Sequence, residues 1–308
     1  MSRPKIRHIA TSYDGKMMAA GEFTKHVHTW DMERREKVAE FDSVLEFGGS
    51  RLAISNNGQW CAAGAYDGAS LAENRYVGGS VALHDASSGK MLWQNKKIKR
   101  VQSLKFSMHW PELLLAGFSD QPLLVVDAEN GSILRKIRGV RHVYESPHEA
   151  IQFRESDSDY ALFDSKNDRE IGRLKRHIFS STLDVSFSET YVLVSEAAGP
   201  VTCYELRSCS QVWQHLPEEG HHLLEVQYNE KTSEFVAVDL QYEKGSGSAL
   251  VWLDETTGLV KRKVLLSGTP WVTGFAARGT LLITSDGILI DTSNGKEIAN
   301  LSFPRETD

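Results

Sequence analysis

An acidic residue that follows a short apolar segment recurs along nearly the whole chain, and this repeat limits the fold more than any other feature of the sequence. The seven acids are Asp31, Asp85, Asp127, Asp164, Glu205, Asp254 and Asp291. From the first acid to the last, six intervals give a mean spacing of about 43 residues, within the ~40–45 residues that one four-stranded propeller blade occupies. Seven acids therefore predict seven blades.

Turn residues follow the acids at a fixed distance. Four of the acids are followed four positions later by a glycine, and a further short strand comes after each glycine; the glycines are Gly89, Gly131, Gly258 and Gly295. Such turns need residues with positive φ, which glycine adopts without steric cost. Asp14-Gly15 and Asn57-Gly58 have the same character and lie between two further pairs of strands. The repeat therefore predicts strands joined by tight antiparallel hairpins.

Composition agrees with an all-β chain in one domain. The 308 residues include 7 Trp, 9 Tyr and 12 Phe against 8 Pro, and aromatic rings pack well on pleated surfaces. A single core usually stops growing near ~250–300 residues, so one domain of this length must spread laterally. We expect one β-propeller over residues 1–308, with seven four-stranded antiparallel blades around a central channel. The approximate blades are 5–42, 50–97, 100–138, 140–176, 182–216, 222–266 and 270–303.

Several motifs resemble the Trp-Asp-repeat (WD-repeat) propeller family. Trp30-Asp31 is a literal Trp-Asp pair, and Ser12-Tyr13-Asp14-Gly15-Lys16 is similar to the turn that precedes a small-residue strand in that family. Ser119-Asp120 resembles the buried Asp of the family's loop between strands b and c, and Gly220-His221 resembles its Gly-His pair. The other repeats depart from these motifs. A second propeller class, with a Gly-x-x-x-Trp repeat, is suggested by Gly89 and Trp93 alone.

Two repeats are longer than the others, and both carry their extra residues in the same class of loop. The insertions fall at 65–79 and at 241–248, each between the second and third strands of its blade. In a propeller the b–c loops and the d–a connections between blades share one face. Binding residues are often found on long loops of a rigid scaffold, although lengthening a loop has a low entropic cost and an insertion can be tolerated without function.

The predicted partner-binding residues therefore lie in these insertions and at the ends of the outermost strands. Aromatic and charged side chains are combined in the insertions, as is typical of interface hot spots, and basic residues recur where strands d end. The predicted set is Tyr66, Asp67, Glu73, Arg75, Tyr76, Lys99, Arg100, Arg138, Arg141, Tyr242 and Lys244. Further basic residues on strands d, among them Arg135, Arg173 and Arg176, are equally explained as protection of the outer edges against pairing with other sheets.

The sequence indicates no catalytic or metal site. His215, His221 and His222 lie close together in the sequence with two glutamates. Zinc needs four ligands in tetrahedral arrangement, and four such ligands cannot be assembled from this segment. The segment therefore indicates a solvated loop. Neither a Gly-x-Ser-x-Gly elbow nor a phosphate-binding glycine loop occurs in the sequence. We expect no catalytic residues, no metal and no cofactor.

Charge and the distribution of cysteines bear on partners and location. The formal net charge is −6, which disfavours nucleic acid as a partner. No apolar segment approaches the ~20 residues of a membrane helix, and the amino terminus lacks the apolar run of a secretory signal. The three cysteines have no metal-site spacing and are typical of a reducing compartment. We expect a cytoplasmic protein that is monomeric alone.

The predicted function is a non-catalytic protein–protein interaction module that binds a macromolecular partner on the face with the b–c and d–a loops. The resemblance to stand-alone Trp-Asp-repeat proteins implies scaffolds, sensors and, in bacteria, cytoplasmic inhibitors of the immunity type that occupy a toxin. The alternative is a propeller enzyme or small-molecule binder at the channel mouth, such as a lactonase-like hydrolase. That alternative requires carboxylates or histidines that converge on the axis.

Overall fold

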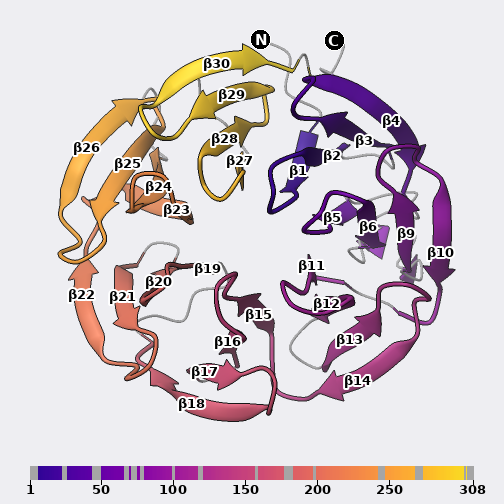
Figure 1. Cartoon of the computed structure of the whole chain (residues 1–308), viewed down its shortest axis with the longest axis horizontal. Helices are drawn as coiled ribbons and strands as arrows, with labels where there is room; N and C mark the ends of the chain where they lie inside the picture. The colour runs from indigo at the N-terminus through magenta and orange to yellow at the C-terminus, as the bar shows by residue number, and fades with distance from the viewer. Residues whose placement is uncertain are drawn as a thin grey trace.

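The described chain forms a ring of seven four-stranded antiparallel sheets, together with one small two-stranded sheet (Figure 1). This computed structural model describes residues 6–22, 26–43, 50–65, 69–70, 75–76, 80–98, 101–116, 121–156, 159–176, 183–196, 199–241, 247–267, 273–301 and 303. The predicted fold, an all-β seven-bladed propeller, is confirmed. Within the described residues there is no helix that could cross a membrane.

Each blade has four strands, a to d, that follow one another in sequence from the axis to the rim (Figure 1). The innermost strands a are β1 (Ile6–Thr11), β5 (Ser50–Ile54), β11 (Ser103–Phe106), β15 (His142–Glu145), β19 (Leu183–Phe187), β23 (His221–Asn229) and β27 (Thr273–Ala276). Strands b are β2 (Met17–Glu22), β6 (Trp60–Ala65), β12 (Glu112–Ala116), β16 (Ile151–Glu155), β20 (Tyr191–Glu196), β24 (Glu234–Gln241) and β28 (Leu281–Thr284). Strands c are β3 (His26–Asp31), β9 (Val81–Asp85), β13 (Leu123–Asp127), β17 (Tyr160–Asp164), β21 (Val201–Glu205), β25 (Ala249–Asp254) and β29 (Ile288–Asp291). Strands d are β4 (Glu36–Asp42), β10 (Met91–Asn95), β14 (Ile133–Ile137), β18 (Arg169–Leu174), β22 (Gln211–His215), β26 (Val260–Leu265) and β30 (Lys296–Asn300).

The recurring acids each form the last residue of a strand c, and their side chains hold the turn to strand d. The carboxylate of Asp254 accepts hydrogen bonds from the backbone N–H groups of Thr256 at 3.0 Å and Thr257 at 2.9 Å. The acids of the other six blades accept from backbone N–H groups two or three residues onward in the same way. A short carboxylate side chain is suited to this local bonding. The repeat is therefore a repeat of c–d turns.

The residue four positions after each acid has positive φ in every blade. Glycine occupies this position in four blades, as the sequence predicts, with φ between 69° and 77°. Arg35, Asp168 and Cys209 occupy it in the other three, with φ of 58°, 50° and 56°. Left-handed backbone costs a non-glycine residue roughly 1–2 kcal/mol. These three blades keep the turn geometry although their sequence lacks its glycine.

The hydrophobic core is divided among the interfaces between neighbouring blades. Each of the seven buried clusters found among the described residues is shared by two adjacent sheets. Tryptophans tie three of these interfaces, because the indole N–H of Trp93, Trp213 and Trp252 donates to a carbonyl in the c–d turn of the next blade, at 2.7–2.9 Å. The last interface joins blade seven to blade one through Trp30 and Phe303, whose ring centroids lie 4.9 Å apart.

Ring closure in the described residues occurs between whole blades. Strands β27 to β30 form blade seven and β1 to β4 form blade one, with no strand exchanged between the two sheets. Blade seven lies next to blade one in the ring, and β27 contacts β1 (Figure 1). Because neighbouring strands are antiparallel, the b–c loops and d–a connections lie at one end of the ring, and the a–b and c–d loops lie at the other. The two inserted segments therefore belong to the same end.

Candidate functional site

The first insertion contains a small hairpin of two paired strands. Strands β7 (Ala69–Ser70) and β8 (Arg75–Tyr76) pair antiparallel, with Ala69 opposite Tyr76 and Ser70 opposite Arg75. The backbone of two predicted binding residues, Arg75 and Tyr76, therefore lies on one strand of a small sheet. The other predicted residues of the two insertions lie outside the described residues, namely Tyr66, Asp67, Glu73, Tyr242 and Lys244.

The predicted basic residues at the d–a connections are described only in part. Arg138 is exposed in the turn after β14, and Arg141 is partly buried just before β15, where its backbone N–H donates to Glu155 O at 2.7 Å. Lys99, Arg100 and the motif residue Asp120 lie outside the described residues. The structure therefore shows Arg138 and Arg141 at one d–a connection.

Other basic residues on strands d are paired within their own blades. Arg135 bonds Glu112 at 2.9 Å, and Arg173 lies 3.0 Å from Glu170. The guanidinium of Arg176 lies 3.3 Å from Glu155, and both of these side chains are buried. These pairs favour a structural role for the three arginines.

The histidine-rich segment before β23 also has a structural role. His221 Nδ1 lies 2.9 Å from Asp239 Oδ2, and Lys263 Nζ donates to the same oxygen at 2.6 Å. A carboxylate at the end of strand b thus holds a cation or imidazole from strands a and d. No group of three or more potential metal ligands occurs within the part of the chain that the structure describes.

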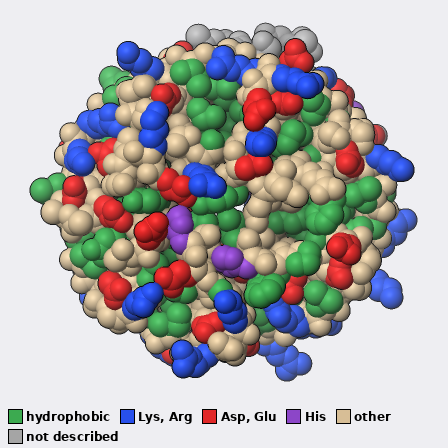
Figure 2. Space-filling view, in the orientation of Figure 1, with side chains coloured by type: hydrophobic (Ala, Val, Ile, Leu, Met, Phe, Trp, Pro, Cys, Tyr) green, Lys and Arg blue, Asp and Glu red, His purple; other side chains and the backbone are tan. Residues whose placement is uncertain are grey.

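The axial channel encloses a cavity of about 630 Å³, within the range typical of ligand pockets. Residues from strands a and a–b loops line it, among them His8, Arg51, Lys105, Tyr144 and Glu225. Tyr13, Asn56 and Arg278 extend the lining to the a–b loops. Figure 2 shows charged and histidine side chains gathered around the hollow at the centre of the face in view. The channel therefore holds titratable groups from blades far apart in sequence.

Burial shifts the pKa values of the channel groups towards their neutral forms. It lowers the pKa of Lys105 to about 8, although the charges of Asp184, Glu225 and Glu145 oppose the shift. Burial raises the pKa of Glu225, and the charge of Asp184 raises it further. Burial likewise raises the pKa of Asp184, against the charge of Lys105. Charged forms are disfavoured here because little water solvates them.

Two further channel groups, on blades one and four, are also held in their neutral forms. Burial, and then the charge of Arg51, lowers the pKa of His8 to about 4, so this imidazole is neutral at pH 7. The pKa of Tyr144 is raised well above its usual value, first by burial. The Lys105 ammonium lies 3.3 Å from the centroid of the Tyr144 ring, a cation–π contact. Lys105 therefore has a fixed position in the channel wall.

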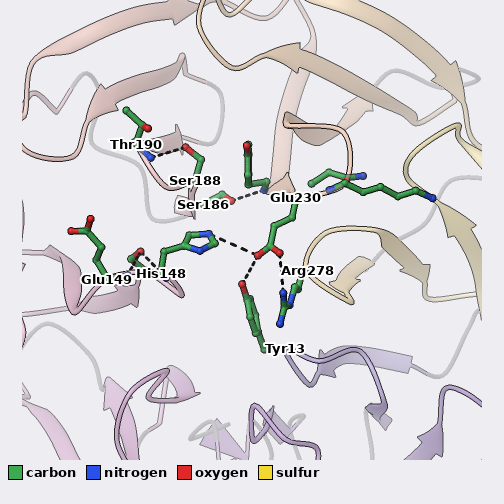
Figure 3. Close-up of polar contacts among 12 residues, drawn as sticks. Tyr13, His148, Glu149, Ser186, Ser188, Thr190, Glu230 and Arg278 are labelled. Carbon is green, nitrogen blue, oxygen red and sulfur yellow. Dashed lines mark hydrogen bonds and ion pairs between the residues drawn. The ribbon is translucent and has the colours of Figure 1, made fainter.

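Glu230 links loops from four blades at the mouth of the channel (Figure 3). Its carboxylate accepts a hydrogen bond from the Tyr13 hydroxyl at 2.6 Å and pairs with the Arg278 guanidinium at 3.2 Å. His148 Nε2, from the loop of blade four, points towards the same carboxylate at 3.8 Å. Burial and the bond to Glu230 raise the pKa of Tyr13, so its hydroxyl remains a donor. These contacts join the a–b loops of blades one, four, six and seven.

The channel groups were not among the residues predicted from the sequence. They come from strands a of different blades, so no local motif joins Lys105 to Tyr144 or Glu225. The available signal was a charged residue in the middle of an innermost strand, as at Lys105 within the segment 101–106.

Comparison with known proteins shows the fold alone. No family model matches the chain, and no curated protein matches it. Among solved structures, the Cps50 (Swd1) β-propeller domain of Myceliophteria thermophila has a TM-score of 0.69 at 12% identity, covering 96% of this chain and 95% of that chain. BamB from Moraxella catarrhalis has a TM-score of 0.59 at 13% identity, with 91% and 80% covered. The dihydro-heme d1 dehydrogenase NirN, in complex with DHE, has a TM-score of 0.63 at 13% identity, with 98% and 67% covered. The chain is similar to propellers of different kinds, and membership of the Trp-Asp-repeat family stays a prediction.

Proposed function

We propose that this chain is a non-catalytic binding module that captures a protein partner on the face with the b–c and d–a loops. The hairpin of β7 and β8 is the observation that carries the proposal. The segment between β6 and β9 is not a plain extension of the b–c loop, because it contains two paired strands of its own. A short hairpin on a closed ring can present side chains to a partner in a fixed orientation, which reduces the entropy lost on binding.

Position supports the same face. Both insertions follow a strand b, so both lie at the end of the ring where Arg138 is exposed. Tyrosine gives a large contact area with few rotatable bonds, and arginine is enriched at interface centres. In its narrowest form the proposal is an immunity-type inhibitor that occupies a toxin in the cytoplasm.

The test begins with capture of the partner from the native host and its identification by mass spectrometry. Binding of the purified partner is then measured for Tyr76→Ala, Arg138→Glu and the control Lys16→Glu, which alters an exposed residue of the a–b loop at the other end. Truncation of a central anchor costs about 2 kcal/mol or more, roughly a 30-fold loss of affinity. A rim charge acts mainly on the association rate and its salt dependence.

The control variant Lys16→Glu tests which face of the ring the partner binds. If Lys16→Glu abolishes binding in a normally folded protein while Tyr76→Ala and Arg138→Glu bind as the parent does, the partner docks on the a–b face and the proposal is wrong.

The second candidate function is a small-molecule binder in the axial channel. It requires carboxylates or histidines that converge on the axis, and Glu225, Glu145 and His8 line the cavity there. An enzyme of this class that depends on a metal would differ from a simple binder in elemental analysis of the purified protein.

A further inference from the structure

The channel contains basic and acidic groups that come from different blades. At one level of the ring, strand-b residues Gly21, Gly64 and Ser195 pair with His8, Arg51 and Asp184. Glu225 lies beside Leu224, the residue of blade six at that level. Among these channel groups the charged bases Arg51 and Lys105 belong to blades two and three, and the acids Glu145, Asp184 and Glu225 to blades four to six, while His8 is neutral at pH 7. Arg278 of blade seven also lines the cavity. Figure 1 shows β5 and β11 across the axis from β19 and β23.

The fold does not require a lysine at the position of Lys105. The strand pairing gives the position in each other blade that is equivalent to Lys105, when positions are counted from the acid at the end of strand c. These positions are Ala10, Ala53, Tyr144, Ser186, Gln227 and Gly274. Alanine, serine and glycine serve at four of these positions, so a small side chain is sufficient for the blade. Folding of the blade therefore does not explain a partly buried cation at this position, because even partial burial disfavours the charged form.

The backbone of Glu225 departs from regular strand geometry, and its carboxyl group makes no hydrogen bond or close ion pair with any other described residue. The pairing of β23 with β24 is irregular between Leu224 and Gln227, and Glu225 has φ of 51°. The side chain lines the cavity, and no hydrogen bond or ion pair reaches its carboxyl group from any other residue that the structure describes. Bulges commonly redirect a side chain next to a binding site. Glu225 is therefore an acceptor available to a molecule in the channel.

We infer that the axial channel is the binding site for a small zwitterion of the amino-acid type, whose ammonium bonds Glu225 and whose carboxylate bonds Lys105. A ligand of this kind supplies a counter-charge to each wall and adds no net charge to the channel. The cavity of about 630 Å³ has room for any free amino acid. A simple amine would offer no acceptor to Lys105, and a simple carboxylate would offer no donor to Glu225. This inference deepens the second candidate function and is independent of partner docking at the loop face.

Binding of the zwitterion should depend on pH, because Glu225 and Lys105 both have titratable neighbours. The groups facing Glu225 are Asp184 and Lys105, and those facing Lys105 also include Glu145 and Tyr144. The raised pKa of Glu225 means that its carboxyl group loses a proton when an ammonium binds. Affinity therefore rises as the pH increases towards about 8, where the carboxyl group of Glu225 loses its proton in the free protein, and falls again as Lys105 loses its proton above about 8.

The test is isothermal titration of the purified full chain with each standard L-amino acid. Each amino acid is compared with its decarboxylated amine and its deaminated acid. At least one amino acid should bind at least ~10-fold more tightly than both analogues, which corresponds to about 1.4 kcal/mol. Glu225→Gln and Lys105→Met should each weaken that binding by ~10-fold or more. The matched control Glu129→Gln, at an exposed residue of a c–d turn, should bind as the parent does.

Three results would overturn the inference: no amino acid binds at millimolar concentration, an analogue binds as tightly as its amino acid, or both channel variants bind normally. If either variant fails to fold, the parent protein alone still tests the inference. Titration of the parent with the amino acid, in buffers of different ionisation enthalpy, must show that binding releases protons at pH ~7. The partner-binding assay on the same two variants separates the proposals. Partner capture that survives while amino acids fail to bind overturns the channel site alone.

Discussion

The contact between Trp213 and Gly258 provides a quantitative test of how neighbouring blades are joined. Gly258 has φ of +69° in the c–d turn of blade six, and a Cβ atom there would lie 2.3 Å from Cε3 and 2.5 Å from Cδ2 of Trp213. The indole is 8% exposed and donates its N–H to Glu255 O at 2.8 Å in the same turn. Because the indole is both packed and bonded, it cannot move aside without losing contacts.

Gly258→Ala should therefore destabilise the protein by two separate effects. The left-handed backbone costs alanine roughly 1–2 kcal/mol, of which ~0.4–1 kcal/mol is offset by the smaller freedom of the unfolded chain. Overpacking against the indole adds roughly 1–3 kcal/mol. The expected loss in the free energy of unfolding is about 2–4 kcal/mol, measured by equilibrium denaturation in urea.

Gly139→Ala is the matched control, because Gly139 has φ of +71° and a Cβ atom added there would have no described atom within 4 Å. Gly139→Ala should lower the free energy of unfolding only by the backbone contribution, about 1 kcal/mol. In a Trp213→Leu background, Gly258→Ala should cost no more than Gly139→Ala does. Equal losses for the two alanine variants in the parent protein would refute the proposed contact between Trp213 and Gly258.

Two further predictions concern the c–d turns. Arg35→Gly should stabilise the protein by roughly 0.5–1 kcal/mol, because relief of left-handed strain exceeds the entropic cost of glycine; urea denaturation that finds it no more stable than the neighbouring Arg34→Gly would contradict this. Hydrogen bonds from Thr256 and Thr257 lower the pKa of Asp254 to about 2, from 3.8. A lowered folded-state pKa gives stability that is present above the unfolded pKa and lost as the pH falls, so the advantage of the parent over Asp254→Asn should shrink between pH ~4 and ~2. An advantage that is constant over this range would show that ionisation of Asp254 does not stabilise the turn.

The blade architecture could be predicted from the sequence because the turns repeat their chemistry. Each acid must accept the same backbone N–H groups, so it recurs at each c–d turn, and Asp85 and Asp291 are separated by four blades yet make equivalent bonds. Gly-x-x-x-Trp was visible only at Gly89 and Trp93. Cys209 and Trp213 have the same spacing, and Trp213 makes the same kind of contact with the next blade. That instance was hidden because cysteine holds the left-handed position in place of glycine.

The predicted binding face could not be assembled to the same degree, since most of its residues lie outside the described part of the chain. Arg75 and Tyr76 were predicted as loop residues, and their backbone forms a strand instead. Two-residue strands carry no periodic signal, so the hairpin could not be distinguished from an irregular insertion.

The channel lies beyond sequence patterns for a different reason. The repeated residues are those that every blade needs in order to fold. The residues that face the axis are not needed in this way, so they can differ from blade to blade. Ala10, Ala53 and Gly274 satisfy the fold at the level where blade three has Lys105 and blade four has Tyr144. Burial of a lysine costs free energy unless a partner offsets it, and the Tyr144 ring and the acids of blades five and six supply only part of that compensation, since the pKa of Lys105 remains lowered. Departures from the repeat that are energetically unfavourable for the protein alone are therefore positions at which a ligand would add a favourable interaction. Lys105 and Glu225 are two such positions, on different blades of the channel wall.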